Sequence, residues 1–321
     1  MPYFVYDRAF SLVVERFIHI EEVTGSIPVT PTINVIILFM RGNFENEVLN
    51  SVSIDQVYDR IASKLKNDQI DMKGFSDLYG GETISRDLAY VQKMEDKFTS
   101  ENNPDLEKAH KLATVFEGIF NEQAELSDWL GSDVVTMKTS RFDDIANGID
   151  SLAEFRETET AASYLGLAID VTTAQDLAGK FGKIKKDIEN GELGRVKYFF
   201  SEYTNVRGEM KNVPRVVIGA DRRTVGNLSE TWAAKDKKAL ANHFIQFQIL
   251  EEISAQLSVF SEYARSVNQS ALAEVYRKTG EKIMNILVGK RKQILDSGER
   301  DSVFAAIENQ VSALKILSKK K

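Results

Sequence analysis

Two short runs with strand-like composition each carry an aspartate among apolar residues. The first run spans residues 148–155 and contains Asp150, and the second spans residues 164–172 and contains Asp170. A charged carboxylate inside an apolar strand is unfavourable unless it is paired or binds a metal ion. Two such acids on neighbouring strands can reach one cation, because adjacent strands lie about 4.8 Å apart. The pair therefore predicts a site for one divalent metal ion.

The amino-acid composition excludes several classes of protein and of functional site. The chain has 321 residues, of which 43% are hydrophobic and 28% charged, which is typical of one to three globular domains. Its net charge of −7 leaves only local patches for nucleic-acid binding. The absence of cysteine excludes disulfides, zinc ribbons and thiol nucleophiles, and it favours a cytoplasmic location. The longest apolar run, residues 35–40, is too short to span a membrane, so we expect no membrane partner.

The N-terminal residues 1–39 differ in composition from the rest of the chain. They hold three of the five prolines and no lysine, and the segment Gly25–Pro28 is what a transfer-RNA T-arm would encode if it were read as codons. One hypothesis is that translation truly starts at Met40 and that residues 1–39 translate the end of an upstream tRNA gene. The alternative is an ordinary N-terminal extension with a short strand at 33–39.

Hydrophobic periodicity divides the remaining chain into three regions. Residues 40–104 are expected to be helical, with helices at 52–66 and 84–98. Residues 105–228 are expected to form an α/β core, and residues 229–321 a helical C-terminal region. The elements expected from residue 105 onward are helix 105–130, strands 133–139, 148–156 and 162–173, helix 175–190, strands 195–201 and 213–220, and helices 233–265, 270–290 and 299–317.

The order helix, three strands, helix and strand, with acids on the second and third strands, resembles the PD-(D/E)XK nuclease superfamily over residues 105–221. The resemblance implies a restriction-endonuclease-like mixed sheet, flanked here by N-terminal and C-terminal helical regions. It also implies that Asp150 and Asp170 bind Mg²⁺ or Mn²⁺, a hard cation that prefers oxygen ligands. A glutamate of the leading helix, Glu117 or Glu122, would support the site, and the spacing does not choose between them.

The chain departs from the family pattern at one position. The family usually has a lysine two residues after the third-strand acid, where it orients the attacking water, but this chain has Thr172. A lysine of the next helix would have to replace it, and we favour Lys183 for this role. If no lysine reaches the site, the resemblance implies a protein that binds nucleic acid without cutting it.

Basic residues near the site indicate a polyanionic partner. The residues expected to contact nucleic acid are Lys180, Lys185, Lys186, Arg222 and Arg223. The alternative for the helical lysines is a solvated helix face with i,i+4 ion pairs.

The two aspartates also have a structural interpretation. Asp150, together with Asp143 and Asp144, would cap a turn around Asn147-Gly148. Asp170 would then pair with Arg141 or Arg156.

The favoured function is a Mg²⁺-dependent nucleic-acid phosphodiesterase. The alternatives are a non-catalytic nucleic-acid-binding or scaffold protein with a degenerate nuclease fold, and a structural protein that does not bind nucleic acid. The long C-terminal helices would also serve to form a homodimer.

Overall fold

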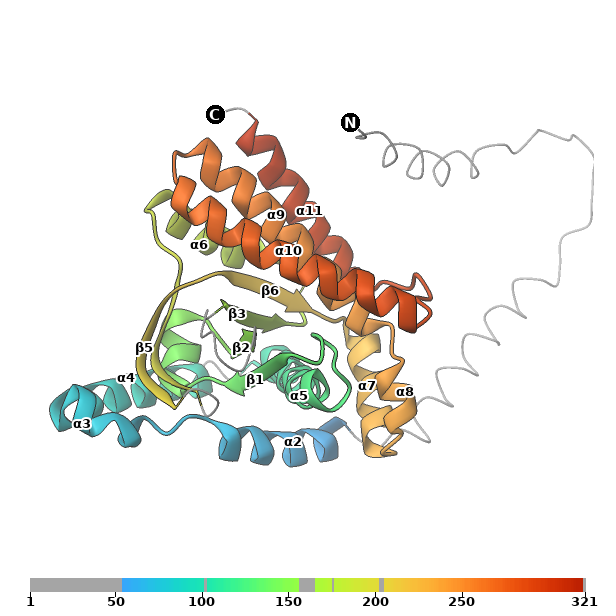
Figure 1. Cartoon of the computed structure of the whole chain (residues 1–321). Helices are drawn as coiled ribbons and strands as arrows, with labels where there is room; N and C mark the ends of the chain where they lie inside the picture. Colours follow the sequence, from blue (N-terminus) through green and yellow to red (C-terminus); the bar gives the residue numbers. More distant parts are fainter. Residues whose placement is uncertain (1–53, 101–102, 156–164, 175, 202–204, 320–321) are drawn as a thin grey trace, which may run out of the picture. The chain divides into compact units, whose positions relative to one another are not determined.

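The structure is a computed structural model that describes residues 54–100, 103–155, 165–174, 176–201 and 205–319. Residues 1–39 and Arg156, about which the sequence suggested hypotheses, lie outside the described residues. The helices and strands, shown in Figure 1, are α2 (Ile54–Asp68), η1 (Met72–Phe75), α3 (Ser76–Tyr79), α4 (Gly81–Ser100), α5 (Pro104–Leu126), β1 (Val134–Lys138), η2 (Asp143–Asn147), β2 (Ser151–Phe155), β3 (Leu165–Thr172), α6 (Ala178–Glu189), β4 (Gly194–Ser201), β5 (Val206–Val213), β6 (Arg215–Gly219), α7 (Arg222–Ala233), α8 (Lys237–Ala241), α9 (Ile245–Ser266), α10 (Ser270–Gln293) and α11 (Ser302–Ser318).

A mixed four-stranded sheet in the order β1-β2-β3-β6 forms the centre of the described chain. The pairs β1/β2 and β2/β3 are antiparallel, whereas β3 and β6 are parallel. This arrangement confirms the expected mixture of helices and sheet in one α/β architecture. Helix α5 leads into the three consecutive strands, and α6 lies between β3 and the returning strand β6 in the sequence.

A separate two-stranded hairpin, β4-β5, is inserted between α6 and β6. A strand was expected at 195–201, where the structure has β4, but β5 was not expected. Most β5 side chains are exposed or half-buried, and charged residues such as Arg207, Glu209 and Lys211 alternate along the strand. A strand of this kind has no apolar face from which its period could be recognised.

Helix α5 supports the sheet from one face. Asn103 caps its N-terminus by accepting hydrogen bonds from the backbone N–H groups of Asp105 and Leu106, and Pro104 occupies the first turn, where no N–H partner is needed. Its buried residues pack against β1 and β3, and α2 packs beside it. The helix ends at Leu126, one turn before the expected Leu130, and Asp128 then adopts a positive φ of 51°.

The expected helix 233–265 is divided in the structure into the end of α7, the short α8 and the long α9. The break follows Ala233, and Lys235 adopts a left-handed φ of 56°. Helix α9 is buried along nearly its whole length, with α10 and α11 packed beside it and its inner face on β6 (Figure 1). None of the described helices combines the length and apolar character needed to cross a membrane.

Three polar side chains of α9 cover the outer edge of β6. Gln256 accepts a hydrogen bond from the Val217 N–H at 2.9 Å and donates to the carbonyl of the same residue at 2.6 Å. Glu252 accepts from the Gly219 N–H at 3.0 Å, and Gln248 donates to the Gly219 carbonyl at 3.0 Å. We call Gln248, Glu252 and Gln256 the edge ladder. It gives the last strand of the sheet the hydrogen bonds that another strand would otherwise supply.

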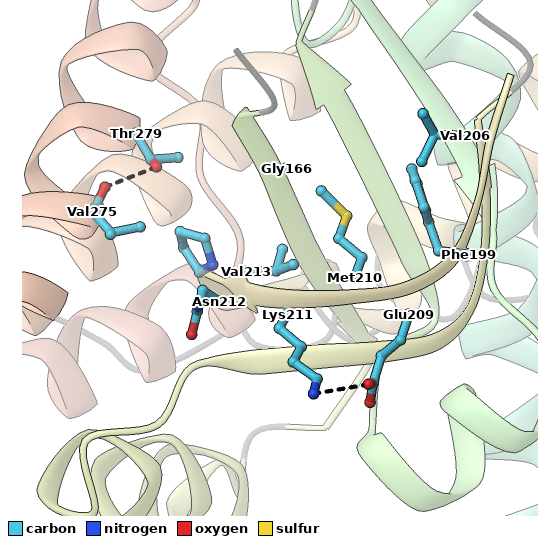
Figure 2. A pocket seen from close by; sticks show the side chains of 11 residues that line it. Gly166, Phe199, Val206, Glu209, Met210, Lys211, Asn212, Val213, Val275 and Thr279 are labelled. Carbon is cyan, nitrogen blue, oxygen red and sulfur yellow. Dashed lines mark hydrogen bonds and ion pairs between the residues drawn. The ribbon is translucent and has the colours of Figure 1, made fainter. Parts of the chain in front are cut away.

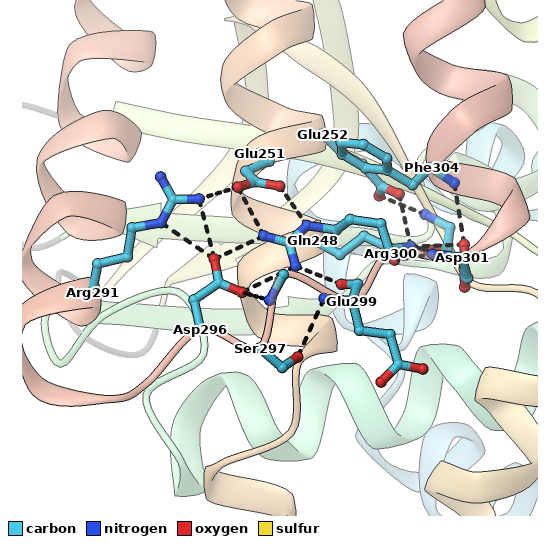
Figure 3. A network of polar contacts seen from close by, with 12 residues as sticks. Gln248, Glu251, Glu252, Arg291, Asp296, Ser297, Glu299, Arg300, Asp301 and Phe304 are labelled. Carbon is cyan, nitrogen blue, oxygen red and sulfur yellow. Dashed lines mark hydrogen bonds and ion pairs between the residues drawn. The ribbon is translucent and has the colours of Figure 1, made fainter. Parts of the chain in front are cut away.

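The edge ladder is possible because the spacing of side chains along a helix matches the spacing of backbone groups along a strand. Four residues of a helix rise about 6 Å. Two residues of a strand rise about 6.6 Å, so side chains at i and i+4 on a helix can meet alternate residues of a strand beside it. Gln248 also donates to the buried Asp301 at 2.9 Å, which joins the start of α11 to the same network (Figure 3).

Candidate functional site

Four carboxylates interact through their charges at one end of the mixed sheet. They are Glu117 of α5, Asp144 of the π-helical turn η2, Asp150 immediately before β2, and Asp170 of β3. Burial raises the pKa of Asp150 well above its usual value, and the charges of Asp144, Glu117 and Asp170 raise it further. We call these four residues the carboxylate cluster. Its central member is an acid that its surroundings disfavour as an anion.

Asp150 is held against the backbone of β3. Its own N–H donates to the Ile169 carbonyl at 2.9 Å, and its Oδ2 accepts a hydrogen bond from the Val171 N–H at 2.7 Å. These two contacts fall on the residues that flank Asp170 in the chain. The structure therefore brings the two aspartates predicted from the sequence to the same place on neighbouring strands.

Asp170 is paired with a lysine of the following helix. Lys180 of α6 forms an ion pair with its Oδ1 and also lies 3.4 Å from the Val171 carbonyl. Burial raises the pKa of Asp170, while the charges of Lys180 and Arg215 oppose that shift. The Asp170 side chain keeps 15% of its surface exposed, so the pair remains open to solvent. The partner is a helix-borne ammonium, and not Arg141.

A buried lysine of β1 is the second cation at this end of the sheet. The Lys138 Nζ lies 2.6 Å from Glu117 Oε1 and 3.4 Å from Asp144 Oδ2. Burial alone would lower the pKa of Lys138, but the charges of Glu117, Asp144 and Asp150 outweigh it and raise the pKa. The ammonium therefore stays charged between these acids.

Sequence reasoning missed Lys138 and gave Asp144 only a turn role. In the structure the buried positions of β1 alternate as Val134, Thr136 and Lys138, so Lys138 stands on the face that packs against α5.

The turn before β2 is fixed by Asp143, the neighbour of Asp144. Asp143 is fully buried and accepts hydrogen bonds from the Ser140 hydroxyl, the Asn147 amide and the backbone N–H groups of Lys197 and Tyr198, at 2.7 to 3.0 Å. Gly148 ends the turn with a φ of 67°. The capping role that the sequence suggested for Asp143 thus exists, and it ties the β4-β5 hairpin to the segment that carries Asp150.

The other residues predicted from the sequence lie in several places. Glu122 pairs with Lys64 at 2.5 Å and accepts from the Trp232 indole N–H at 2.9 Å, so Glu117 is the α5 acid that joins the cluster. Lys183 donates to the Asn147 carbonyl at 3.1 Å, near the cluster. The remaining predicted contacts are on the surface: Lys185, 3.6 Å from Glu189; Lys186, exposed on α6; and Arg222 and Arg223, exposed at the start of α7.

The divalent-metal site expected at Asp150 and Asp170 stays a prediction. Within the described ranges, no group of three or more histidine, cysteine, aspartate or glutamate side chains is arranged to hold a metal ion. Mg²⁺ commonly binds through one or two carboxylates and completes its shell with water and substrate oxygens. Asp150 and Asp170 can supply those two carboxylates.

Two cavities lie beside the strands of the described chain. One, of about 280 Å³, is lined by the β4-β5 hairpin, the start of β3 and α10, and it contains no member of the cluster (Figure 2). The other, of about 550 Å³, lies between α2, α5 and β1 and includes Lys138 in its lining. None of the four carboxylates lines the second cavity, and its link to the cluster is Lys138, which pairs with Glu117 and Asp144.

Comparison with family models, with curated proteins and with solved structures gave no match to this chain.

Proposed function

We propose that this protein is a Mg²⁺-dependent nucleic-acid phosphodiesterase with a restriction-endonuclease-like core. The observation that carries the proposal is Asp150, a buried carboxyl surrounded by three other acids and held against the residue after Asp170. Strongly perturbed acids gather at functional sites, because burial and like charges there shift the pKa of a group toward the value that catalysis needs. The strand order and the placement of the acids before β2 and on β3 further support this type of core.

The residues of the cluster suit the hydrolysis of a phosphodiester. When bound, a divalent cation supplies a nucleophilic water at neutral pH and neutralises charge on the phosphoryl oxygens. In this proposal Asp150 and Asp170 hold the cation, and Glu117 and Asp144 add negative charge around it. Lys180 is the ammonium nearest to Asp170 and takes the water-orienting role that the sequence suggested for Lys183.

Cleavage of labelled single-stranded DNA, duplex DNA and RNA, with Mg²⁺ or Mn²⁺ and with EDTA, tests the function. We expect Asp150→Asn to reduce cleavage at least about 100-fold, equivalent to about 2.7 kcal/mol of transition-state stabilisation. Asp133→Asn is the matched control, because Asp133 is exposed before the opposite end of β1 from Lys138. Cleavage that persists in EDTA, or an Asp150→Asn variant as active as Asp133→Asn, would contradict the proposal.

A second candidate function is nucleic-acid binding without cleavage. It is favoured by Thr172, which stands where the family usually has a lysine, and by Lys180, whose ammonium already occupies one oxygen of Asp170. Gel-shift binding that is unchanged by EDTA, together with no cleavage of any of the three substrates, would select this alternative.

A further inference from the structure

Two cations converge on a single backbone oxygen beside the carboxylate cluster. The Asn147 carbonyl accepts a hydrogen bond from Lys183 Nζ at 3.1 Å and another from Arg215 Nη1 at 2.8 Å. Lys183 comes from α6 and Arg215 from the first position of β6. A carbonyl dipole satisfies hydrogen bonds, but it cannot neutralise two positive charges.

The positive charge at this point is only partly compensated. Arg215 is buried, with 5% of its surface exposed, and its Nη2 lies 3.1 Å from Asp187 Oδ2. Lys183 is exposed, and among the described residues the Asn147 carbonyl is the one hydrogen-bond partner of its ammonium. Burial and the charge of Arg215 lower the pKa of Lys183, and the charges of Asp187 and Asp170 oppose that shift without reversing it. An added anion would remove this imbalance.

The backbone beside the two cations carries no side chain. Gly148 follows Asn147, and a Cβ built on it would lie 3.5 Å from Lys183 Nζ and 3.9 Å from Arg215 Nη1. Any larger residue would place atoms next to both cations, in addition to the strain of a φ of 67°. Glycine at this position therefore leaves the space around the cation pair open.

The cation pair also has a defined place relative to the cluster. Lys183 lies one helical turn after Lys180, the lysine that is paired with Asp170, and the two positions share a helix face. Asn147 is three residues before Asp150 on a turn that Asp143 fixes in place. An anion bound by Lys183 and Arg215 would thus lie beside the carboxylate cluster, but its own contacts would be with positively charged side chains.

We propose that Lys183 and Arg215, meeting over Gly148, form a binding site for a phosphate group. The proposed function enters this inference in one respect: the phosphate bound naturally would be one of a nucleic-acid strand, next to the phosphate that is cleaved. A free phosphate or a mononucleotide offers the same chemistry and is the other source that the experiment must distinguish.

Binding in EDTA, where no cleavage can occur, tests the site separately from catalysis. Inorganic phosphate and a single-stranded oligonucleotide are the two probes, and the variants are Lys183→Gln, Lys183→Arg and the matched control Lys238→Gln, which removes an exposed lysine of α8. We expect Lys183→Gln to weaken the binding of both probes about tenfold, as for the loss of one charged hydrogen bond. It should also reduce the slope of log affinity against log salt by about one for the oligonucleotide.

The outcomes separate the sources and the competing explanations. Equal weakening for both probes, with partial recovery in Lys183→Arg and no change in Lys238→Gln, supports a site for a strand phosphate. Weakening for inorganic phosphate alone supports a phosphate site whose source is a free anion. If Lys183→Gln binds both probes as the wild type does, or if the wild type binds neither, the site is overturned. A protein that binds as expected but cuts no substrate refutes the nuclease proposal and leaves this site standing.

Discussion

The edge ladder on α9 and the carboxylate cluster at the end of the sheet are both buried polar regions, but they are built in opposite ways. In the ladder, Gln248, Glu252 and Gln256 each meet a complementary backbone group of β6. In the cluster, Asp150 meets three carboxylates of its own charge and is compensated by lysines that contact its neighbours. In the edge ladder each side chain has its hydrogen-bond partners, whereas in the carboxylate cluster the charged form of Asp150 is disfavoured.

The pKa of one carboxyl in each region shows the same contrast. Burial raises the pKa of Glu252 well above its usual value and the charges of Asp301 and Glu251 raise it further, while the hydrogen bonds from Gly219 and Gln248 favour the anion. Burial also raises the pKa of Asp150, but there the next contributions are the charges of three acids, which act in the same direction as burial. The two acids therefore differ in degree: donors accompany the like charges around Glu252, whereas three like charges dominate around Asp150.

The largest effect is expected from breaking the edge ladder. Gln256→Leu keeps the apolar volume but leaves both the N–H and the carbonyl of Val217 without a partner in the core. Each unsatisfied buried group costs about 1–3 kcal/mol, so we expect a loss of about 3 kcal/mol in the free energy of unfolding, measured by urea denaturation. Gln293→Leu, at an exposed position on α10, is the control and should change stability by less than about 0.5 kcal/mol. A similar loss in both variants would show that the ladder contributes nothing specific.

A smaller effect of opposite sign is expected in the cluster. Asp150→Asn keeps an oxygen that can accept from the Val171 N–H and removes one of the four carboxylates. Relief of like-charge repulsion should raise the free energy of unfolding by about 1 kcal/mol at pH 8 without metal, while cleavage is lost. Urea denaturation of this variant and of Asp133→Asn measures the difference. Destabilisation by Asp150→Asn would mean that the acid serves the fold, like the acids of the ladder.

The smallest effect concerns the pH dependence of stability. Because the pKa of Asp150 is raised in the folded protein, the stability it contributes is fully present below the unfolded value, about 3.9, and is lost as the pH rises through the folded value. The advantage of Asp150→Asn over the wild type should therefore grow with pH toward the total of about 1 kcal/mol expected at pH 8. Glu252 shifts in the same direction but is present in both proteins, so it cancels. Urea unfolding of both proteins from pH 5 to 9 measures this difference. If the pKa of Asp150 were not shifted, plots of the free energy of unfolding against pH would run parallel for Asp150→Asn and the wild type.

The sequence predicted the elements whose periodicity is strong and whose partners are near in the chain. Helix α5, strands β1 to β3 and helix α6 all lie within a few residues of their expected bounds. Asp170 lies on β3 as expected, whereas Asp150, expected inside a strand, lies one residue before β2 and contacts β3 from there. What was missed depends on contacts between distant segments. Lys138 and the edge ladder were recognisable only after α5 and α9 had been placed against the sheet, because a lysine or glutamine alone is compatible with a solvated face.

The edge ladder limits how copies of this protein can assemble. A sheet normally grows by adding a strand to an unpaired edge, which is also the route by which folded chains polymerise into fibres. On the β6 side that route is closed by amide and carboxyl groups that belong to a helix, and opening it would require α9 to leave the centre of its helical layer. Self-association through the C-terminal helices would then be a contact between helices, and not an extension of the sheet at β6.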